Sequence, residues 1–230
     1  MFPAVAAYAL QQRVFAFRRI NREHLREHLA FGARSFFTPL LQDATTKVDV
    51  LVLGIFASDA VVGVYAFAAM LAIEGAYQIL YVVQINLSPM LSAIPAESRG
   101  EDLRRLLRRA TMYLTPAMFA VGGVGTLLFP AVARILTDND EFAKGWPFFA
   151  IILAGLTLGA GRLPFSVALN QWGMPGAFFG FALFQLASNT VLNLALVPFF
   201  GGLGSAIGTA ISYALTALYL QCVFSRLKNE

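Results

Sequence analysis

The stretch "LPFSVALNQWGMPGAFFGFALFQLASNTVLNLALVPFFGGLGSAIGTAISYALTALYLQCVFS", from Leu163 to Ser225, contains no charged residue. A helix needs about 20 consecutive apolar residues to cross the hydrocarbon core of a bilayer. A soluble protein cannot bury 63 uncharged residues in a row. Two further uncharged stretches lie between Arg109 and Arg134 and between Lys144 and Arg162. The pattern therefore predicts several membrane-spanning helices.

The composition of the whole chain leads to the same class. Its 230 residues are 58% hydrophobic and 13% charged, and the mean hydropathy is +0.66. Soluble domains carry about 25% charged residues. The fold class predicted from these values is all-α, a polytopic bundle of membrane helices.

Charge and rare residues exclude several classes of function. The chain is basic, with a pI of about 9.5, but its arginines lie between the predicted spans, so no nucleic-acid partner is expected. Cys222 is the single cysteine, which excludes an intrachain disulfide and a cysteine-based metal motif. With only two histidines in the sequence, neither a His-rich metal site nor a Ser-His-Asp triad is expected, and no cofactor is predicted.

Six complete spans can be drawn, separated by turn signals such as "ASDA", "GMPG" and "VPFFGG". They cover residues 29–56, 61–94, 110–133, 146–170, 177–196 and 203–224. Residues 1–24 read as part of a preceding helix followed by a basic cytoplasmic linker. Residues 25–230 read as a six-helix transmembrane lobe.

Lysine and arginine set the orientation of the predicted spans. Twelve of them lie before the first span, between the second and third, and after the sixth, whereas the opposite side has only Arg134 and Lys144. Positive charge accumulates on the cytoplasmic side of membrane proteins. Both ends of the lobe are therefore expected in the cytoplasm.

Besides Arg34 near its cytoplasmic end, three charged residues lie inside the first predicted span. Asp43 and Lys47 are four residues apart, so they share a helix face and can pair. Asp49 is two residues beyond Lys47 and faces elsewhere. Because a charge at the bilayer centre costs several kcal/mol, about 2.5–3.5 on insertion scales, such residues face a cavity or a partner. Asp49 is near the outer end of the span, where we expect it to face water.

Further polar residues follow in other spans. The second span contains Glu74, Gln78 and Asn86, and the fourth contains Arg162 in "GAGRLP". One interpretation is a polar cavity inside the bundle. The other is that the pairs Asp43–Lys47 and Glu74–Arg162 are ion pairs that only fix helix packing. The residues alone leave both interpretations open.

Two segments resemble a known family. "NTVLNLALVPFFGGLGSAIGTAISYAL" (Asn189 to Leu215) and "KVDVLVLGIFASDAVVGVYAFAAML" (Lys47 to Leu71) are similar to hairpins of the Wzx-type O-antigen and polysaccharide flippases. These belong to the superfamily that includes the multidrug and toxic-compound extruders. The resemblance covers roughly residues 25 to 226 and implies a C-terminal lobe. Because such flippases have two six-helix lobes, it also implies a second lobe, either from a homodimer or from a separate N-terminal half.

The resemblance implies a function. The chain would be a flippase rather than an enzyme, moving undecaprenyl-pyrophosphate-linked oligosaccharide to the periplasmic leaflet of the bacterial inner membrane for O-antigen and lipopolysaccharide synthesis. Lys47 and Arg162 would bind phosphate, and Gln78 and Asn86 would bind sugar hydroxyls. The candidates for taking up a coupling proton or sodium ion are Asp43, Glu74 and Asp49. The alternatives are a multidrug or cation extruder of the same fold, a membrane-embedded enzyme of polysaccharide synthesis, and a non-transporting remnant.

Overall fold

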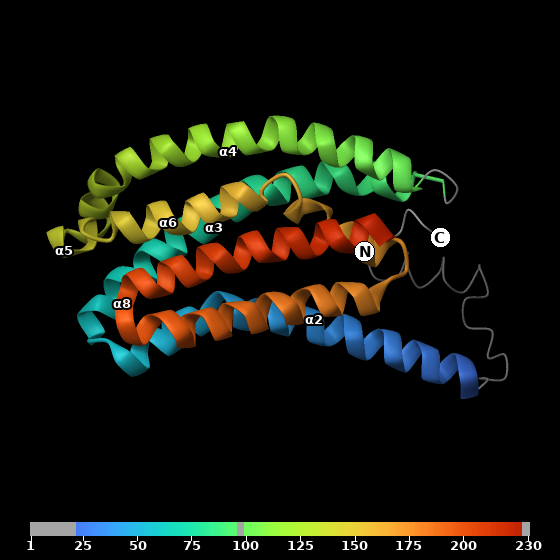
Figure 1. Ribbon diagram of the computed structural model, residues 1–230, viewed down its shortest axis with the longest axis horizontal. Coiled ribbons are helices and arrows are strands. Elements are labelled where there is room, and N and C mark those ends of the chain that lie inside the picture. The colour runs from blue at the N-terminus through green and yellow to red at the C-terminus, as the bar shows by residue number, and fades with distance from the viewer. Residues whose placement is uncertain (1–21, 96–98, 227–230) are drawn as a thin grey trace, which may run out of the picture.

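The computed structural model describes residues 22–95 and 99–226, so most of the predicted partial helix and linker at 1–24 lies outside the described residues. The described part is helical and contains no strand, which confirms the all-α class (Figure 1). Its elements are α2 (Arg22–Phe56), α3 (Asp59–Ser92), α4 (Arg99–Thr137), α5 (Asp140–Ala143), α6 (Trp146–Gly159), the 3-10 turn η2 (Leu163–Phe165), α7 (Ser166–Gln171) and α8 (Pro175–Arg226).

Helix α8 is a hairpin of two arms, residues 175–200 and 202–226, which lie side by side in Figure 1. The chain reverses at Gly201, whose φ of 54° and ψ of −131° favour glycine because it has no side chain. Ser205 Oγ donates a hydrogen bond of 2.7 Å to Asn193 Oδ1 across the two arms. The first arm continues to Phe200, four residues beyond the predicted end of the fifth span at Leu196.

The number of spans is only partly tested. Within residues 22–95 and 99–226, four helices are long and apolar enough to cross a membrane, which confirms a multi-pass protein. The hairpin α8 counts once among them, and the charged helix α2 is not included. The count of six stays a prediction.

The fourth predicted span is not one helix. The prediction of a continuous helix over residues 146–170 is wrong, because α6 ends at Gly159 and η2 and α7 follow as short separate turns. Pro164 lies in this break and lacks the backbone N–H that a continuing helix would require. Gly161 allows close packing here, since a Cβ atom at this position would lie 2.5 Å from the Cα atom of Thr111. The break brings Leu163, Pro164 and Ser166 toward α3.

The arginine-rich start of α4 continues directly into the membrane span. Helix α4 is a single helix from Arg99 to Thr137, so the basic segment Gly100–Arg109 and the predicted third span at 110–133 share one helix. Leu103 and Leu107 are buried, whereas the arginines between them are exposed. Farther along, α4 exposes large apolar side chains, as expected for a helix that faces lipid.

Helix α8 packs against α2 and α6, and in Figure 1 its second arm lies in the middle of the bundle while its first arm lies along the lower edge beside α2. A close approach joins α6 to the second arm, where a Cβ atom on Gly155 would lie 2.4 Å from the Cα atom of Ala210. Small residues of this kind let membrane helices approach closely. This packing leaves a polar hollow between α2, α3 and the first arm of α8.

Candidate functional site

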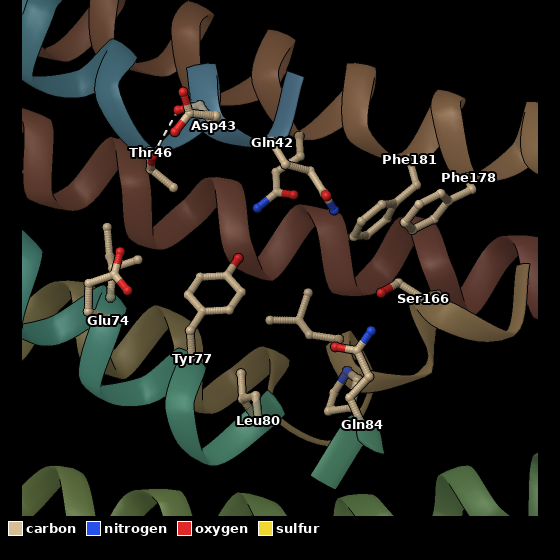
Figure 2. Close-up of a pocket in the computed structure, with 14 residues that line it drawn as sticks. Gln42, Asp43, Thr46, Glu74, Tyr77, Leu80, Gln84, Ser166, Phe178 and Phe181 are labelled. Carbon is tan, nitrogen blue, oxygen red and sulfur yellow. Dashed lines mark hydrogen bonds between the residues drawn. The ribbon is translucent and has the colours of Figure 1, made fainter. Parts of the chain in front are cut away.

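A cavity of about 380 Å³ lies between α2, α3, the η2–α7 break and the first arm of α8 (Figure 2). Helix α2 contributes Gln42, Asp43 and Thr46. The full lining is Gln42, Asp43, Thr46, Ile73, Glu74, Tyr77, Leu80, Gln84, Leu163, Pro164, Ser166, Phe178, Phe181 and Gln185. The cavity is therefore built by residues that are far apart in the sequence.

The cavity lining combines carboxylates and amides with aromatic rings. Asp43 and Glu74 supply two carboxylates, three glutamines supply amides, and Thr46, Tyr77 and Ser166 supply hydroxyl groups. Neither lysine nor arginine is among the lining residues. Groups of this kind can exchange hydrogen bonds with many hydroxyl groups, because an amide both donates and accepts.

The predicted pair Asp43–Lys47 forms. Lys47 Nζ donates to Asp43 Oδ2 over 2.9 Å, and both side chains are 65% exposed. The helical spacing predicted this contact, but only the aspartate is among the residues that line the cavity. Exposed pairs of this kind contribute about 0–1 kcal/mol to stability in water.

The second ion pair that the sequence suggested does not form. Within the described residues Glu74 pairs with no cation, and Arg162 donates from Nε to Gln221 Oε1 over 3.1 Å. The expected Glu74–Arg162 pair is thus wrong. The pair does not form because the chain breaks after α6. The break places Arg162 at the start of η2 and beside the end of the second arm of α8. Arg162 is half-buried and directly precedes the lining residue Leu163.

The predicted hydroxyl-binding residues Gln78 and Asn86 are exposed on α3 and do not line the cavity. Asn86 Nδ2 donates to the carbonyl oxygen of Val82 on its own helix over 2.7 Å. Another face of α3 is turned inward, and there Tyr77 and Gln84 reach the cavity (Figure 2). The sequence predicted polar residues of α3 at the site, but it did not predict which face of α3 points into the cavity.

Asp49 does not face water, so that expectation is wrong. Its side chain is 1% exposed and lies in the core of the bundle. Tyr65 donates its hydroxyl to Asp49 Oδ2 over 2.6 Å, and Thr209 Oγ1 donates to the same oxygen over 3.3 Å. The backbone N–H of Val50 donates to Oδ1 over 2.8 Å. The cause of the burial is the α8 hairpin, which covers this end of α2 and α3.

The buried polar network continues along the α8 hairpin. Asn189 Oδ1 accepts from Thr209 over 3.3 Å and from Asn193 Nδ2 over 2.6 Å, while Asn189 Nδ2 donates to the carbonyl oxygen of Thr45 over 3.0 Å. Asn193 in turn accepts from Ser205. These side chains are at most 2% exposed. The sequence analysis missed them, although Asn189 and Asn193 repeat at the four-residue spacing of one helix face.

This network is rich in oxygen and contains one carboxylate. An isolated charged carboxylate is costly to bury, so its charge must be neutralised or balanced. Within the described residues Asp49 has no cationic partner. The described part of the chain contains no group of three or more His, Cys, Asp or Glu residues that would hold a metal ion. The arrangement is suited to a proton or to a monovalent cation with oxygen ligands.

Comparisons with known proteins give a matching family and two relatives, together with the share of each chain that is matched. A family model described as polysaccharide biosynthesis protein matches residues 4–139. Two curated relatives come from Haloferax volcanii. "Probable flippase AglR" is 27% identical over 184 residues, covering 74% of this chain and 36% of the relative. "Probable low-salt glycan biosynthesis flippase Agl15" is 25% identical over 176 residues, also covering 74% of this chain and 36% of the relative.

The matched stretch therefore spans little more than a third of the length of each of these relatives. No solved structure matches the chain.

Proposed function

The chain belongs to the polysaccharide biosynthesis protein family, and we propose that it forms one lobe of a flippase for a lipid-linked oligosaccharide. The observation that carries this proposal is the cavity of carboxylates, amides and hydroxyl groups between α2, α3 and the first arm of α8 in a bundle of apolar helices. Polar groups at membrane depth are costly and mark the path of a polar cargo. The names of the two relatives favour a transporter over a membrane-embedded enzyme.

The proposed cargo is undecaprenyl-pyrophosphate-linked oligosaccharide, moved from the cytoplasmic to the periplasmic leaflet of a bacterial inner membrane. Arg162 is the proposed contact for its pyrophosphate. Among the described residues Arg162 bonds through Nε only, so its two terminal nitrogens are available to an anion. An arginine fork can bind phosphate through two parallel hydrogen bonds. Lys47 is a second proposed phosphate contact, and Gln78 and Asn86 remain proposed hydroxyl contacts for a cavity enlarged by a second lobe.

The experiment that tests the function is expression of the chain in a strain that lacks its polysaccharide flippase. Restored surface polysaccharide supports the proposal, and no restoration with or without a second lobe contradicts it.

Arg162→Lys keeps the charge but loses the fork, and we expect a loss of about 1.5–3 kcal/mol of cargo binding, or roughly 10- to 150-fold. Arg134→Lys is the matched control, because Arg134 is exposed and pairs with Asp140 at the other end of α4. Equal losses in the two variants would remove Arg162 from the proposed site.

Asp49 is the foremost of the three proposed coupling residues. Thr209 Oγ1 lies 3.3 Å from Asp49 Oδ2, 3.3 Å from Asn189 Oδ1 and 3.4 Å from Tyr65 Oη. Tyr65 Oη lies only 2.6 Å from the same Asp49 oxygen, so the carboxylate is held by hydrogen-bond donors at this spacing. The occupant proposed for Asp49 is therefore a proton, with a monovalent cation that replaces these hydrogen bonds as the alternative. Asp43 and Glu74 remain coupling candidates inside the cavity.

A second lobe is the proposed partner. The cavity-facing Asp43 and Glu74 and the neighbouring Lys47 are exposed on the described lobe, and charges facing hydrocarbon are costly. We predict that the functional form is a homodimer or a complex with a separate N-terminal half. Mass measurement on the complex extracted in mild detergent tests this prediction. A monomer that flips cargo would contradict it.

The proposed orientation predicts where reagents reach the chain. In a Cys222→Ser background, cysteine introduced as Ser58→Cys or Asn139→Cys is expected to react with a membrane-impermeant thiol reagent in intact cells. Cysteine introduced as Glu101→Cys, at the other end of the bundle, is expected to react only after the cells are opened. All three positions are exposed, so the comparison reports sidedness. The reverse pattern would overturn the orientation and the cytoplasmic placement of the ends.

One observation favours a second function, a cation extruder of the same fold. Such a protein requires an acidic cavity, and the described cavity contains Asp43 and Glu74 without a lining lysine or arginine. The pairing of Asp43 with Lys47 leaves Glu74 as the lining carboxylate without a cationic partner among the described residues. Resistance of cells to a toxic organic cation, lost in Glu74→Gln, would support this function. If resistance is unchanged in Glu74→Gln, the extruder function is contradicted and the flippase function is the one that remains.

A further inference from the structure

A second hollow of about 360 Å³ adjoins the cavity along α3. Its lining is Tyr81, Gln84, Ile85, Ser88, Pro89, Ser92 and Val167, and it shares Gln84 with the main cavity. The two hollows therefore lie next to each other along α3, the first reaching Glu74 near the middle of the helix and the second reaching Ser92 at its end. We name the part from Tyr81 to Ser92 the α3 end groove.

The surface of the α3 end groove is uncharged and mainly apolar. Its two serines are already bonded within the protein: Ser92 Oγ donates to the carbonyl oxygen of Ser88 over 2.9 Å, and Gln171 Nε2 donates to Ser88 Oγ. The surface left for a ligand is dominated by Tyr81, Ile85 and Pro89, spaced four residues apart on one face of α3, and by Val167. The main cavity differs in having two carboxylates and three glutamines.

We propose that the α3 end groove binds the hydrocarbon chain of a lipid-linked sugar whose head lies in the main cavity. The proposal rests on the proposed function and adds a chain-binding subsite to it. A polar hollow followed by an apolar one matches a molecule with a sugar head and a hydrocarbon chain. The groove lies toward the end of α3 that the arginine bias assigns to the cytoplasm, where the chain trails once the head has reached mid-depth.

Tethering selects the cargo chain over the chains of bulk phospholipid. Lipid tails are as apolar as the groove, so burial in it brings little hydrophobic gain within a bilayer. A bulk lipid therefore gains little free energy when it leaves the surrounding lipid tails for the groove. A chain whose head is held in the adjoining cavity is presented at high effective concentration, which favours its binding without any new contact.

Trp172 provides a reporter beside the groove. Its Nε1 donates to the carbonyl oxygen of Leu91 over 2.9 Å, next to Ser92. The sequence has two tryptophans, so Trp146→Phe leaves Trp172 as the sole emitter. The probe is an undecaprenyl-phosphate-linked monosaccharide with bromine added across its chain double bonds, since bromine quenches nearby indole emission. A phospholipid brominated in its acyl chains, at the same mole fraction in nanodiscs, is the comparison.

We expect the brominated cargo analogue to cause a loss of Trp172 emission that the brominated phospholipid does not cause. Val167→Phe fills the groove and is expected to abolish this loss. Val121→Phe, an equal change at an exposed position of α4, is expected to leave it intact. Equal quenching by both lipids, or quenching that survives Val167→Phe, would overturn the subsite.

Native mass measurement of the chain with the same analogue separates the two proposals. Association without quenching of Trp172 overturns the chain-binding subsite and leaves the proposed function standing. Absence of association, with or without a second lobe, contradicts the proposed function itself.

Discussion

Asp49→Asn is expected to remove the ion response of the protein while the helix bundle still forms. Asparagine has nearly the shape of aspartate but no charge to balance a bound cation. Removing one partner of a buried charge pair costs about 2–5 kcal/mol, which corresponds to a loss of about 30-fold or more in ion affinity. Asn189 and Thr209 would still supply oxygens, but none of these carries a charge.

The measurement is the thermal stability of the purified chain as sodium is added at fixed ionic strength, repeated across pH to detect a proton as the occupant. Tyr65→Phe is the control for simple disruption of the network, because it removes the donor to Asp49 and keeps the carboxylate. Asp59→Asn is the control for loss of a carboxylate, because Asp59 is exposed at the start of α3 and lies outside the main cavity. If Asp49→Asn responds to sodium and to pH as the unchanged protein does, Asp49 is not the coupling residue.

Gly155→Ala is expected to disrupt the packing of α6 against the second arm of α8. The added Cβ atom would lie 2.4 Å from the Cα atom of Ala210 and 2.5 Å from its carbonyl oxygen, and backbone atoms cannot turn aside as a flexible side chain can. Overpacking of this kind costs about 1–3 kcal/mol, occasionally more. Because the hairpin also holds the network around Asp49, the ion response should weaken together with stability.

Gly54→Ala is the matched control for the same chemical change. Gly54 lies within α2, and a Cβ atom there meets nothing within 4 Å. Helix propensity alone makes alanine about 1 kcal/mol more favourable than glycine in a helix. Both variants are unfolded by rising concentrations of a denaturing detergent, and the shift of each unfolding midpoint from that of the unchanged protein is measured. Equal shifts in the two midpoints would show that the α6–α8 contact is not as close as described.

Predictions from local sequence patterns were reliable where both partners of an interaction lie on the same helix. The four-residue spacing predicted the Asp43–Lys47 pair, and the same helix geometry turned Asp49 to another side. Turn residues marked the break at Gly173 and the end of α2 at Phe56. The break after α6 was missed, although its glycines and Pro164 are signals of the same kind.

Residues whose role depends on packing between helices were predicted less well. Arg162 contacts Gln221 rather than Glu74, because the break after α6 redirects it. On α3 the cavity takes Gln84, while Gln78 and Asn86 are exposed. Thr209 became visible as a partner of Asp49, and Asn189 as a partner of Thr209, only when the hairpin brought them beside α2.

The sequence by itself determined that this is an all-α membrane protein, where most of its helices lie and which charges are neighbours on one helix. The tertiary structure alone decided which face of each helix points inward, that Asp49 is buried, and that a polar cavity opens beside a largely apolar groove. The reason lies in the solvent. In water an apolar stripe identifies the buried face of a helix. In a bilayer the outside is as apolar as the inside, so hydrophobic periodicity carries no such signal and packing chooses the face.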